Sequence, residues 1–192
     1  MRIFLTGGTG FVGSNLLKYF INNENEIIAL KRTSESKTKI HLDRQPNWII
    51  GSLKNIEKKH LNNIDLLIHL AAHSAQPPYD NLQNCIAQNV IEPINLFEKA
   101  FDAGVRRFLV AGSCFEYGLS ANSYEYIPPN ASLFPIDSYP ASKAMASIAF
   151  IQWAIEKKVS LSIQRLFYLY GEGESKKRFF PALVDAALKG ND

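Results

Sequence analysis

The chain has 192 residues and a formal net charge of +3 at pH 7, a length that suffices for one α/β domain with a hydrophobic core. Its basic residues form no long run of the kind that binds nucleic acid, so we expect small anionic ligands rather than a polymer. The apolar stretches are strand-length or broken by charges, which argues against a membrane span. The two cysteines, Cys85 and Cys114, lie far apart and no secretory leader is recognised, so we expect a cytoplasmic protein.

The first thirteen residues join a short apolar run to a glycine-rich turn. Residues 3–5 are apolar and predict a buried strand, and Gly7, Gly10 and Gly13 follow it. In a dinucleotide-binding turn the first glycine permits the tight turn, the second admits a pyrophosphate, and the third lets the helix pack closely. Glycines also punctuate ordinary turns, so the triplet is informative only together with the helix and strand that follow at the distance of a βαβ unit.

Strands and helices alternate along the rest of the chain. Strands are predicted over residues 27–30, 47–50, 65–71, 107–111 and 161–170, and helices over residues 14–22, 84–103, 138–157 and 181–189. This alternation predicts an α/β fold of Rossmann type, a doubly wound parallel sheet with helices on both faces, in one domain over residues 1–192. Ligands then bind at the carboxyl ends of the strands, where the long loop 118–135 is expected to carry substrate or cover a site.

Three polar residues are expected at those carboxyl ends. Ser113 follows the strand over 107–111, and Tyr139 and Lys143 are spaced i, i+4 on one face of the next helix. A lysine ammonium beside a phenol lowers the pKa of the phenol from about 10, and a serine hydroxyl can hold a carbonyl that is being reduced. A tyrosine–lysine pair is more often a plain surface pair, but its place after the glycine turn and Ser113 favours an acid/base role.

These segments together resemble the extended short-chain dehydrogenase/reductases, in the NAD-dependent epimerase/dehydratase group that acts on nucleotide sugars. The matching segments, in chain order, are Thr6–Gly13, Asp65–Ala72, Asn89-Val90, Asn95-Leu96, Ala111–Gly118, Tyr139–Lys143 and Arg165–Gly171. The resemblance implies that Tyr139 is the general acid/base, that Lys143 lowers its pKa and contacts the nicotinamide ribose, and that Ser113 orients the reacting hydroxyl or carbonyl. The cofactor then carries the hydride.

The resemblance also implies the remaining contacts. The residues expected along the cofactor, besides the glycines and the tyrosine–lysine pair, are Phe11, Val12, Leu70, Ala71, Ala72, Asn89, Phe167 and Leu169, with Ser52 and Leu53 near the adenine. The residues expected at the substrate rim are His73, Ser74, Gln76, Cys114, Phe115 and Arg178. No metal is expected, because His69 and His73 have no third ligand at suitable spacing.

Two departures from the family pattern refine the prediction. Where NAD-using relatives carry an aspartate after the second strand, this chain has Lys31 and Arg32, cations that would attract a 2′-phosphate. We therefore expect NADP(H) rather than NAD(H), with two solvated charges as the alternative interpretation. The acidic pair that follows the serine in sugar dehydratases is replaced by Cys114 and Phe115, so dehydration is not expected. Glu116 is not expected to supply the missing carboxylate, because alternation points it elsewhere.

The function predicted from these residues is NADP(H)-dependent reduction of a 4-keto-6-deoxyhexose carried on a nucleoside diphosphate. One alternative is an NAD-dependent nucleotide-sugar 4-epimerase, since both reactions pass through a ketone. An alternative of another class is a cofactor-binding regulatory module without turnover. The intact set of Ser113, Tyr139 and Lys143 argues against that module.

The resemblance carries two further expectations about assembly and extent. A homodimer is expected through helices 84–103 and 139–157, with apolar contacts from Ile86, Ile94, Phe150 and Trp153. Members of the group continue into a small substrate domain, which we expect to be largely absent from this chain. The last helix, 179–190, is expected to lie at the start of that region.

Overall fold

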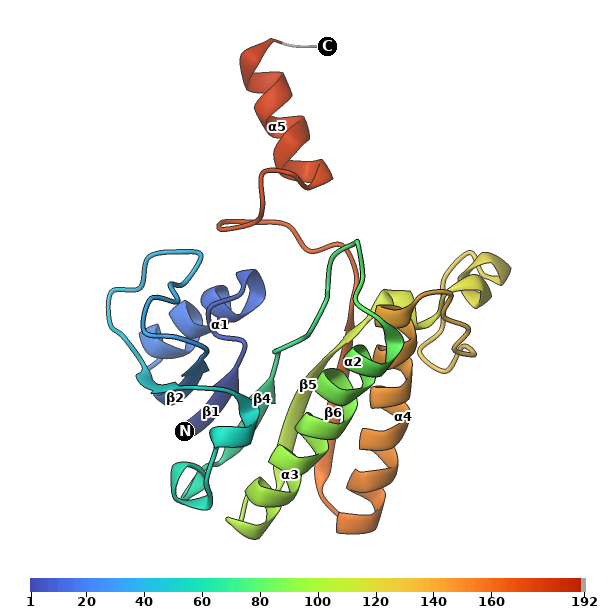
Figure 1. Ribbon diagram of the computed structural model, residues 1–192. Helices are drawn as coiled ribbons and strands as arrows, with labels where there is room; N and C mark the ends of the chain where they lie inside the picture. The colour runs from blue at the N-terminus through green and yellow to red at the C-terminus, as the bar shows by residue number, and fades with distance from the viewer. Residues whose placement is uncertain (191–192) are drawn as a thin grey trace.

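A computed structural model describes residues 1–190 as a six-stranded parallel sheet in the order β3-β2-β1-β4-β5-β6 (Figure 1). The strands are β1 (Arg2–Thr6), β2 (Glu26–Lys31), β3 (Asn47–Ile50), β4 (Leu66–His69), β5 (Arg107–Ser113) and β6 (Ser160–Leu166). The α-helices are α1 (Phe11–Asn22), α2 (Leu82–Ile86), α3 (Glu92–Asp102), α4 (Ser138–Lys157) and α5 (Phe179–Lys189). The strand order reverses between β1 and β4, which is the topology of doubly wound dinucleotide-binding sheets, and the predicted fold class is confirmed.

Shorter helical segments connect these elements. They are the 3₁₀ turns η1 (Leu53–Asn55), η2 (Lys58–Leu61), η4 (Cys114–Glu116) and η5 (Leu119–Ser123), and the π-helical turn η3 (Ala87–Ile91). The turn η4 precedes the predicted long loop over 118–135, and η5 lies within that loop. The loop also forms an isolated bridge between Gly118 and Phe134.

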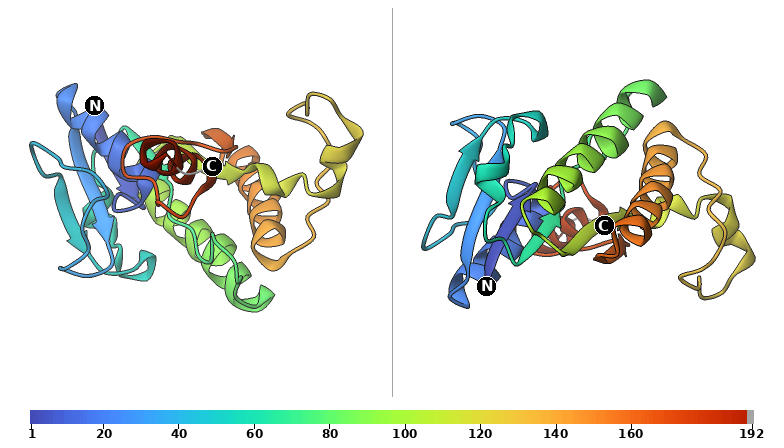
Figure 2. Two further views of the ribbon diagram at one scale, coloured as in Figure 1. Left: turned by 90° about the horizontal axis from the view of Figure 1, so that it is seen from above. Right: turned by 90° about the horizontal axis from the view of Figure 1, so that it is seen from below.

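The two faces of the sheet bury alternate residues of the same strands. In β1, Phe4 packs with α3 and α4, whereas Ile3 and Leu5 pack with Leu17 of α1 on the opposite face. This division follows from the two-residue period of a strand. Figures 1 and 2 show α3 and α4 side by side on one face, with α1 near the other end of the sheet.

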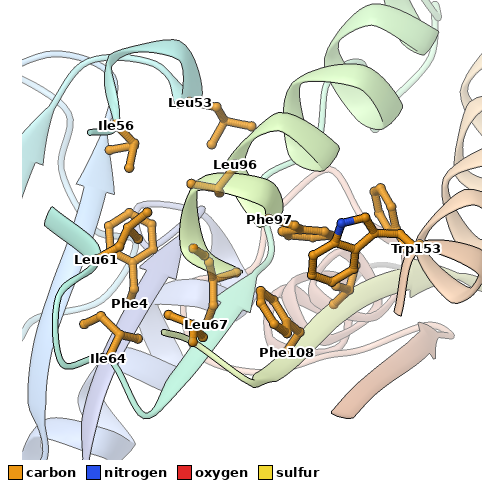
Figure 3. Packing of buried hydrophobic residues seen from close by; sticks show 14 of the residues in the cluster. Phe4, Leu53, Ile56, Leu61, Ile64, Leu67, Leu96, Phe97, Phe108 and Trp153 are labelled. Carbon is orange, nitrogen blue, oxygen red and sulfur yellow. The ribbon is translucent and has the colours of Figure 1, made fainter. Parts of the chain in front are cut away.

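An aromatic cluster joins α3 and α4 to the sheet (Figure 3). The ring of Phe97 lies 5.5 Å from that of Phe108, 4.9 Å from that of Phe150 and 5.4 Å from that of Trp153, measured between centroids. The indole N–H of Trp153 donates to Glu98 at 2.9 Å, so its polar atom is satisfied at the edge of the core. The predicted dimer contacts Phe150 and Trp153 are therefore core residues, and Ile86 and Ile94 also pack partly against this core.

The single helix predicted over 84–103 is wrong in one respect, because a π-helical turn interrupts it. The N–H of Glu92 bonds to the carbonyl of Ala87, five residues back. Pro93 follows directly, and a proline cannot make the usual bond to the residue four positions earlier and crowds that carbonyl. The wider turn removes this conflict, and such turns are frequent at functional sites.

Two strands also end earlier than predicted, and β5 ends two residues later. β4 stops at His69 and β6 at Leu166, whereas β5 runs on to Ser113. Residues 167–170 are exposed chain beyond the sheet, because no neighbouring strand extends far enough to pair with them. Beyond them α5 stands above the edge at which the parallel strands end, with Phe179 and Leu188 81% and 82% exposed (Figure 1). Among residues 1–190, no helix combines the length and the hydropathy that a membrane crossing needs.

Candidate functional site

The glycine-rich turn after β1 is built for close backbone approach. Gly7 has a φ of +75°, and a β-carbon on it would lie 2.6 Å from the backbone nitrogen of Ala71. A β-carbon on Gly13 would lie 2.1 Å from the carbonyl oxygen of Gly7, so only glycine lets α1 pack against the turn. α1 begins without a side-chain cap, which leaves N–H groups of its first turn available to an anion.

The end of β4 meets this turn, which places residues 70–72 beside it. The Thr6 hydroxyl lies 2.8 Å from Nδ1 of His69 and accepts from the Ala71 N–H at 3.3 Å. His69 is buried, and desolvation, with a smaller contribution from the Lys143 charge, lowers its pKa to about 3. It is therefore a neutral structural residue at physiological pH. Within residues 1–190, no group of three or more metal-ligating side chains comes together.

Asn89 fastens the loop that follows β4. Its side chain accepts from the His73 N–H at 2.7 Å and donates to the His73 carbonyl at 3.1 Å and the Ser142 hydroxyl at 2.9 Å. These three bonds join the π-helical turn, the loop and α4. Asn89 therefore positions this loop, and its contact with a cofactor stays a prediction.

The predicted substrate residues of this loop are held close to α2. Nε2 of His73 lies 2.7 Å from Oδ2 of Asp80, and Ser74 accepts from the Asp80 N–H at 2.7 Å. Gln76 is exposed on the same loop. The ring of Tyr79, which the sequence prediction overlooked, stacks on that of Tyr139 at 5.5 Å and thereby covers the candidate acid/base.

Beyond the carboxyl end of β2, along the segment that leads into β3, an open pocket of about 510 Å³ is lined mainly by basic and hydroxyl side chains. Its lining comprises Lys31, Ser34, Ser36, Lys37, Thr38, Lys39, Ile40, His41, Leu42, Gln45 and Trp48. Nζ of Lys31 donates to the Ser34 carbonyl at 3.0 Å and lies 5.5 Å from the centroid of the Trp48 ring. Arg32 is exposed but does not line the pocket, so it is Lys31 that the structure joins to Lys37 and Lys39.

The residues predicted near the adenine behave differently from one another. Ser52 is exposed and caps a 3₁₀ turn by bonding to Asn55 at 2.9 Å. Leu53 is buried in the core with Phe4 and Ile28, so it supports the sheet from below. Of the two, Ser52 is the exposed residue, and the contact of either with an adenine stays a prediction.

Ser113, Tyr139 and Lys143 are brought together at the end of β5 and the start of α4, and all three are buried. Nζ of Lys143 donates to the Ala111 carbonyl at 2.7 Å. Burial lowers the pKa of Lys143 to about 8, against an opposing effect from the negative charge of Glu116. The predicted cluster is thus present as a geometric unit.

The expected lowering of the Tyr139 pKa is not found. Burial of the phenol raises its pKa to about 12, and the nearby Ser113 hydroxyl opposes that rise. Lys143 does not lower it, because the ammonium is directed to the Ala111 carbonyl of β5. In this arrangement Tyr139 keeps its proton at physiological pH, and it can donate that proton only to a strongly basic atom, such as an oxygen on which negative charge develops.

Glu116 forms a buried network beneath these three residues. Its side chain is fully buried; Oε1 accepts from the Ser113 N–H at 2.7 Å, and Oε2 accepts from the Ser147 hydroxyl at 2.7 Å and from Nε of Arg165 at 2.8 Å. Nη1 of Arg165 also donates to the Tyr117 hydroxyl at 3.1 Å. The sequence prediction set Glu116 aside, and its pairing with Arg165 becomes visible only in the folded sheet.

The side chains expected at the mouth of the site are more exposed. Cys114 is half-buried, and Phe115 meets the ring of Tyr168 edge-on at 6.2 Å. Phe167 and Leu169 are 53% and 38% exposed on the segment after β6. Arg178 lies at the start of α5, paired loosely with Glu174 at 3.8 Å.

The comparison with known families agrees with this geometry. The model of the NAD dependent epimerase/dehydratase family matches residues 3–192. The chain belongs to this family. The family predicted from the sequence motifs is therefore confirmed.

Two curated relatives show the range of reactions within the family. The chain is 28% identical, over 97% of its length, to the 4-hydroxy-2-methyl-3-oxo-4-farnesyl-3,4-dihydroquinoline-1-oxide ketoreductase of Stigmatella aurantiaca, of which it covers 55%. It is 25% identical, over 100% of its length, to the UDP-glucose 4-epimerase of Lactobacillus helveticus, of which it covers 61%. A ketoreductase and an epimerase are thus about equally similar to this chain.

Solved structures of family members share the fold. MoeE5 in complex with UDP-glucose and NAD matches 99% of this chain with a TM-score of 0.79 and 26% identity. TunA, described as an NAD dependent NDP-hexosamine 5,6-dehydratase, matches 97% with a TM-score of 0.82 and 25% identity. This chain covers 62% and 61% of those two structures, so it spans about three fifths of their length.

Proposed function

We propose that the protein is an NADP(H)-dependent oxidoreductase that reduces a ketosugar carried on a nucleoside diphosphate, most specifically a 4-keto-6-deoxyhexose. The observation that carries the proposal is the cluster of Ser113, Tyr139 and Lys143 at the carboxyl edge of the sheet that also bears the glycine turn. The family's relatives support a nicotinamide cofactor and a nucleotide sugar, because MoeE5 binds NAD and UDP-glucose. The Stigmatella relative is a ketoreductase.

The residues of this chain fit a dinucleotide. A pyrophosphate would lie at the start of α1, where Gly7 and Gly13 leave no room for side chains and the first helical N–H groups are open. The ribose and bridging region would lie along Ala71 and Ala72, and the nicotinamide end near Phe167 and Leu169. Bound there, the cofactor would supply a hydride.

The basic pocket beside β2 supports NADP(H) over NAD(H). Lys31, Lys37 and Lys39 face it with the hydroxyl groups of neighbouring serines and a threonine, a set of donors suited to a phosphate monoester. Within residues 1–190, none of these three lysines forms an ion pair. A 2′-phosphate would therefore meet available positive charge.

The chain's own residues would then act on the substrate carbonyl. The Ser113 hydroxyl would hold the carbonyl oxygen, and Tyr139 would donate its phenolic proton to that oxygen as negative charge develops on it. Lys143 would contact the ribose, and the phenolate that remains would regain a proton from solvent. Neither Cys114 nor Phe115 supplies a carboxylate after Ser113, so these residues offer no acid or base for eliminating water.

The alternative is an NAD-dependent 4-epimerase, favoured by the match of the whole chain to the Lactobacillus enzyme. The two functions differ in the fate of the cofactor. A reductase oxidises one NADPH per substrate molecule, whereas an epimerase returns the hydride and leaves the absorbance of the cofactor unchanged. Nucleotide ketosugars with NADPH or NADH, and nucleotide sugars that carry a 4-hydroxyl with NAD, are screened for product and for a change in cofactor absorbance to test the proposal. Product inversion without net cofactor oxidation would favour the epimerase, and neither activity would favour the regulatory module.

We also propose a homodimer through α2, α3 and α4, in the cytoplasm. Apolar side chains are exposed on α4 and on the turn η3 between α2 and α3, at positions other than those first expected, namely Ile91, Met145, Ile148, Ile151 and Ile155. The exposed face of α5 is proposed to begin the substrate region. Sedimentation at micromolar concentration tests the dimer, with an Ile148→Lys, Ile155→Lys double variant expected to be monomeric. A monomeric parent protein would contradict it.

A further inference from the structure

We propose that Glu116 is a positioning residue of the candidate site, whose buried carboxylate fixes the Ser113 backbone and provides the negative charge that balances the Lys143 ammonium. This inference rests on the proposed function for its catalytic meaning. It goes beyond that function by assigning a role to a residue outside the tyrosine, lysine and serine set. Glu116 follows Phe115 in the sequence, and Glu116 itself is not expected to contact the substrate.

The Glu116 carboxylate and the Lys143 ammonium bond to the same short segment of backbone at the end of β5. Oε1 of Glu116 accepts from the Ser113 N–H at 2.7 Å, and Nζ of Lys143 donates to the Ala111 carbonyl at 2.7 Å. Between them lies Gly112, on which a β-carbon would be 2.8 Å from Oε1 of Glu116. The end of β5 is therefore held from one side by an anion and from the other by a cation.

The Glu116 carboxylate is bonded on both oxygens to groups of the protein itself. Besides the Ser113 N–H, it accepts from Ser147 of α4 and Arg165 of β6, and its side chain has no exposed surface. A group so enclosed cannot exchange protons with a substrate. It can act only through the residues it touches, which come from β5, α4 and β6.

The charge of Lys143 depends on the titratable groups that face it. From β4 it faces His69, which burial keeps neutral at physiological pH, and from its own helix it faces the protonated phenol of Tyr139. Glu116 is the group whose charge raises the pKa of Lys143 against the effect of burial. Arg165 neutralises part of that charge but lies at 2.8 Å on the far oxygen, Oε2. Low polarity around the group makes such a charge effective.

The charge of Glu116 therefore affects the pH at which Lys143 loses its ammonium charge. Lys143 is protonated below about pH 8 and loses its charge above it. Removing the Glu116 charge lowers the pKa of Lys143 further, so the Lys143 ammonium is lost at a lower pH. Turnover that depends on the ammonium should fall off at that lower pH as well.

The test compares Glu116→Gln, which removes the charge and keeps the shape, with Ser147→Ala, which removes a hydrogen bond to the same carboxylate and keeps the charge. The pKa of Lys143 is followed by NMR of labelled lysine, with the signal assigned by its loss in Lys143→Met. The kcat against pH profile is recorded in parallel with a ketosugar and NADPH. We expect a lower Lys143 midpoint and about tenfold lower kcat at pH 8 for Glu116→Gln, largely recovered at pH 6. Ser147→Ala should keep the parental midpoint.

Every outcome decides the inference. An unchanged Lys143 midpoint in Glu116→Gln, or an equal shift in Ser147→Ala, would overturn it. If Glu116→Gln does not fold, Glu116→Asp retains the charge at a shorter reach and should keep the midpoint while lowering kcat at every pH; a shifted midpoint there would also overturn it. If the parent protein turns over no substrate, the proposed function fails, while the NMR titration still decides the role of Glu116.

Discussion

Positive charge gathers at two places along the carboxyl edge of the sheet, and the two settings differ. Beside β2, Lys31, Lys37 and Lys39 line an open pocket. At the end of β5, Lys143 is buried and bonded to a carbonyl, and Arg165 is paired with the buried Glu116. Exposed cations remain free to bind an incoming anion, but salt screens their charge. Buried cations are fixed in place, and burial lowers the pKa of a lysine, so that its charge depends on pH near neutrality. The open end is therefore suited to selecting the cofactor and the buried end to chemistry.

The largest expected effect tests the buried end. Tyr139→Phe should lower kcat by a factor on the order of 10³, because it removes the proton donor while preserving the ring that stacks on Tyr79. NADPH affinity should stay nearly unchanged, since the phenolic proton matters in the transition state. Steady-state kinetics and fluorescence titration measure both quantities, with Tyr19→Phe on the exposed surface of α1 as the control. A variant that retained most of its kcat would remove Tyr139 from the acid/base role.

A second effect concerns stability at the same buried end. Burial lowers the pKa of His69 to about 3, below its ordinary value of about 6.5. As the pH falls, His69 binds a proton in the unfolded state before it does so in the folded state. The free energy of unfolding is therefore highest above pH 6.5 and falls between pH 6.5 and 3, by about 1.4 kcal/mol per pH unit for this group. Denaturant unfolding at several pH values measures the loss. His69→Gln should flatten it, whereas His41→Gln, at a side chain that is 87% exposed, should not.

Ser113→Ala should have a smaller effect on turnover. The variant loses a hydrogen bond to the substrate oxygen but no proton donor, at a cost of about 2 to 3 kcal/mol in the activation free energy. The variant also loses the 3.3 Å hydrogen bond that the Ser113 hydroxyl accepts from the Phe115 N–H, whereas its own backbone N–H remains bonded to Glu116. The kcat of the variant is compared with that of Ser162→Ala, an exposed serine of β6. Combined with Tyr139→Phe, the loss should be less than additive, because the residues act as one unit.

The smallest effect tests the open end. Lys31→Ala with Lys39→Ala should weaken NADPH binding about tenfold and leave NADH binding nearly unchanged, since only NADPH carries the 2′-phosphate. The difference should shrink as salt is raised. Lys58→Ala with Lys59→Ala, in the turn η2, is the matched control. Equal affinities of the parent protein for the two cofactors would contradict the preference for NADP(H). A comparable loss of NADPH affinity in Arg32→Ala would show that Arg32 also contacts the 2′-phosphate.

Much of this architecture could be predicted because the strands are short apolar runs separated by strong turn signals. The glycine turn, the six strands and the helix over 138–157 follow from spacing and composition alone. The boundaries of β4 and β6 could not be predicted in the same way, because a strand ends where its neighbour stops pairing, and that depends on the rest of the sheet. Apolar residues 167–170 continue the pattern of β6 but have no partner.

The chemistry of the site was predicted less completely than its location. The proximity of Ser113, Tyr139 and Lys143 follows from a motif, but the pKa of Tyr139 depends on burial and on where the lysine points. The network of Glu116 requires Arg165, which is 49 residues away in the sequence and becomes a neighbour only in the sheet. Long-range pairs of this kind carry no local signal.

The π-helical turn over Ala87–Ile91 constrains which changes in chain length the protein could accept. A π-helical turn holds one residue more than the α-helical turn it replaces, so deleting a single residue there would restore a regular helix. Every residue after it would then rotate by about 100° around the helix axis. Phe97 would leave the aromatic cluster while Asn89 lost its alignment with the loop at His73. Insertions and deletions should therefore be tolerated in the loop 118–135 and excluded from this turn, a difference that the lengths of natural variants can reveal.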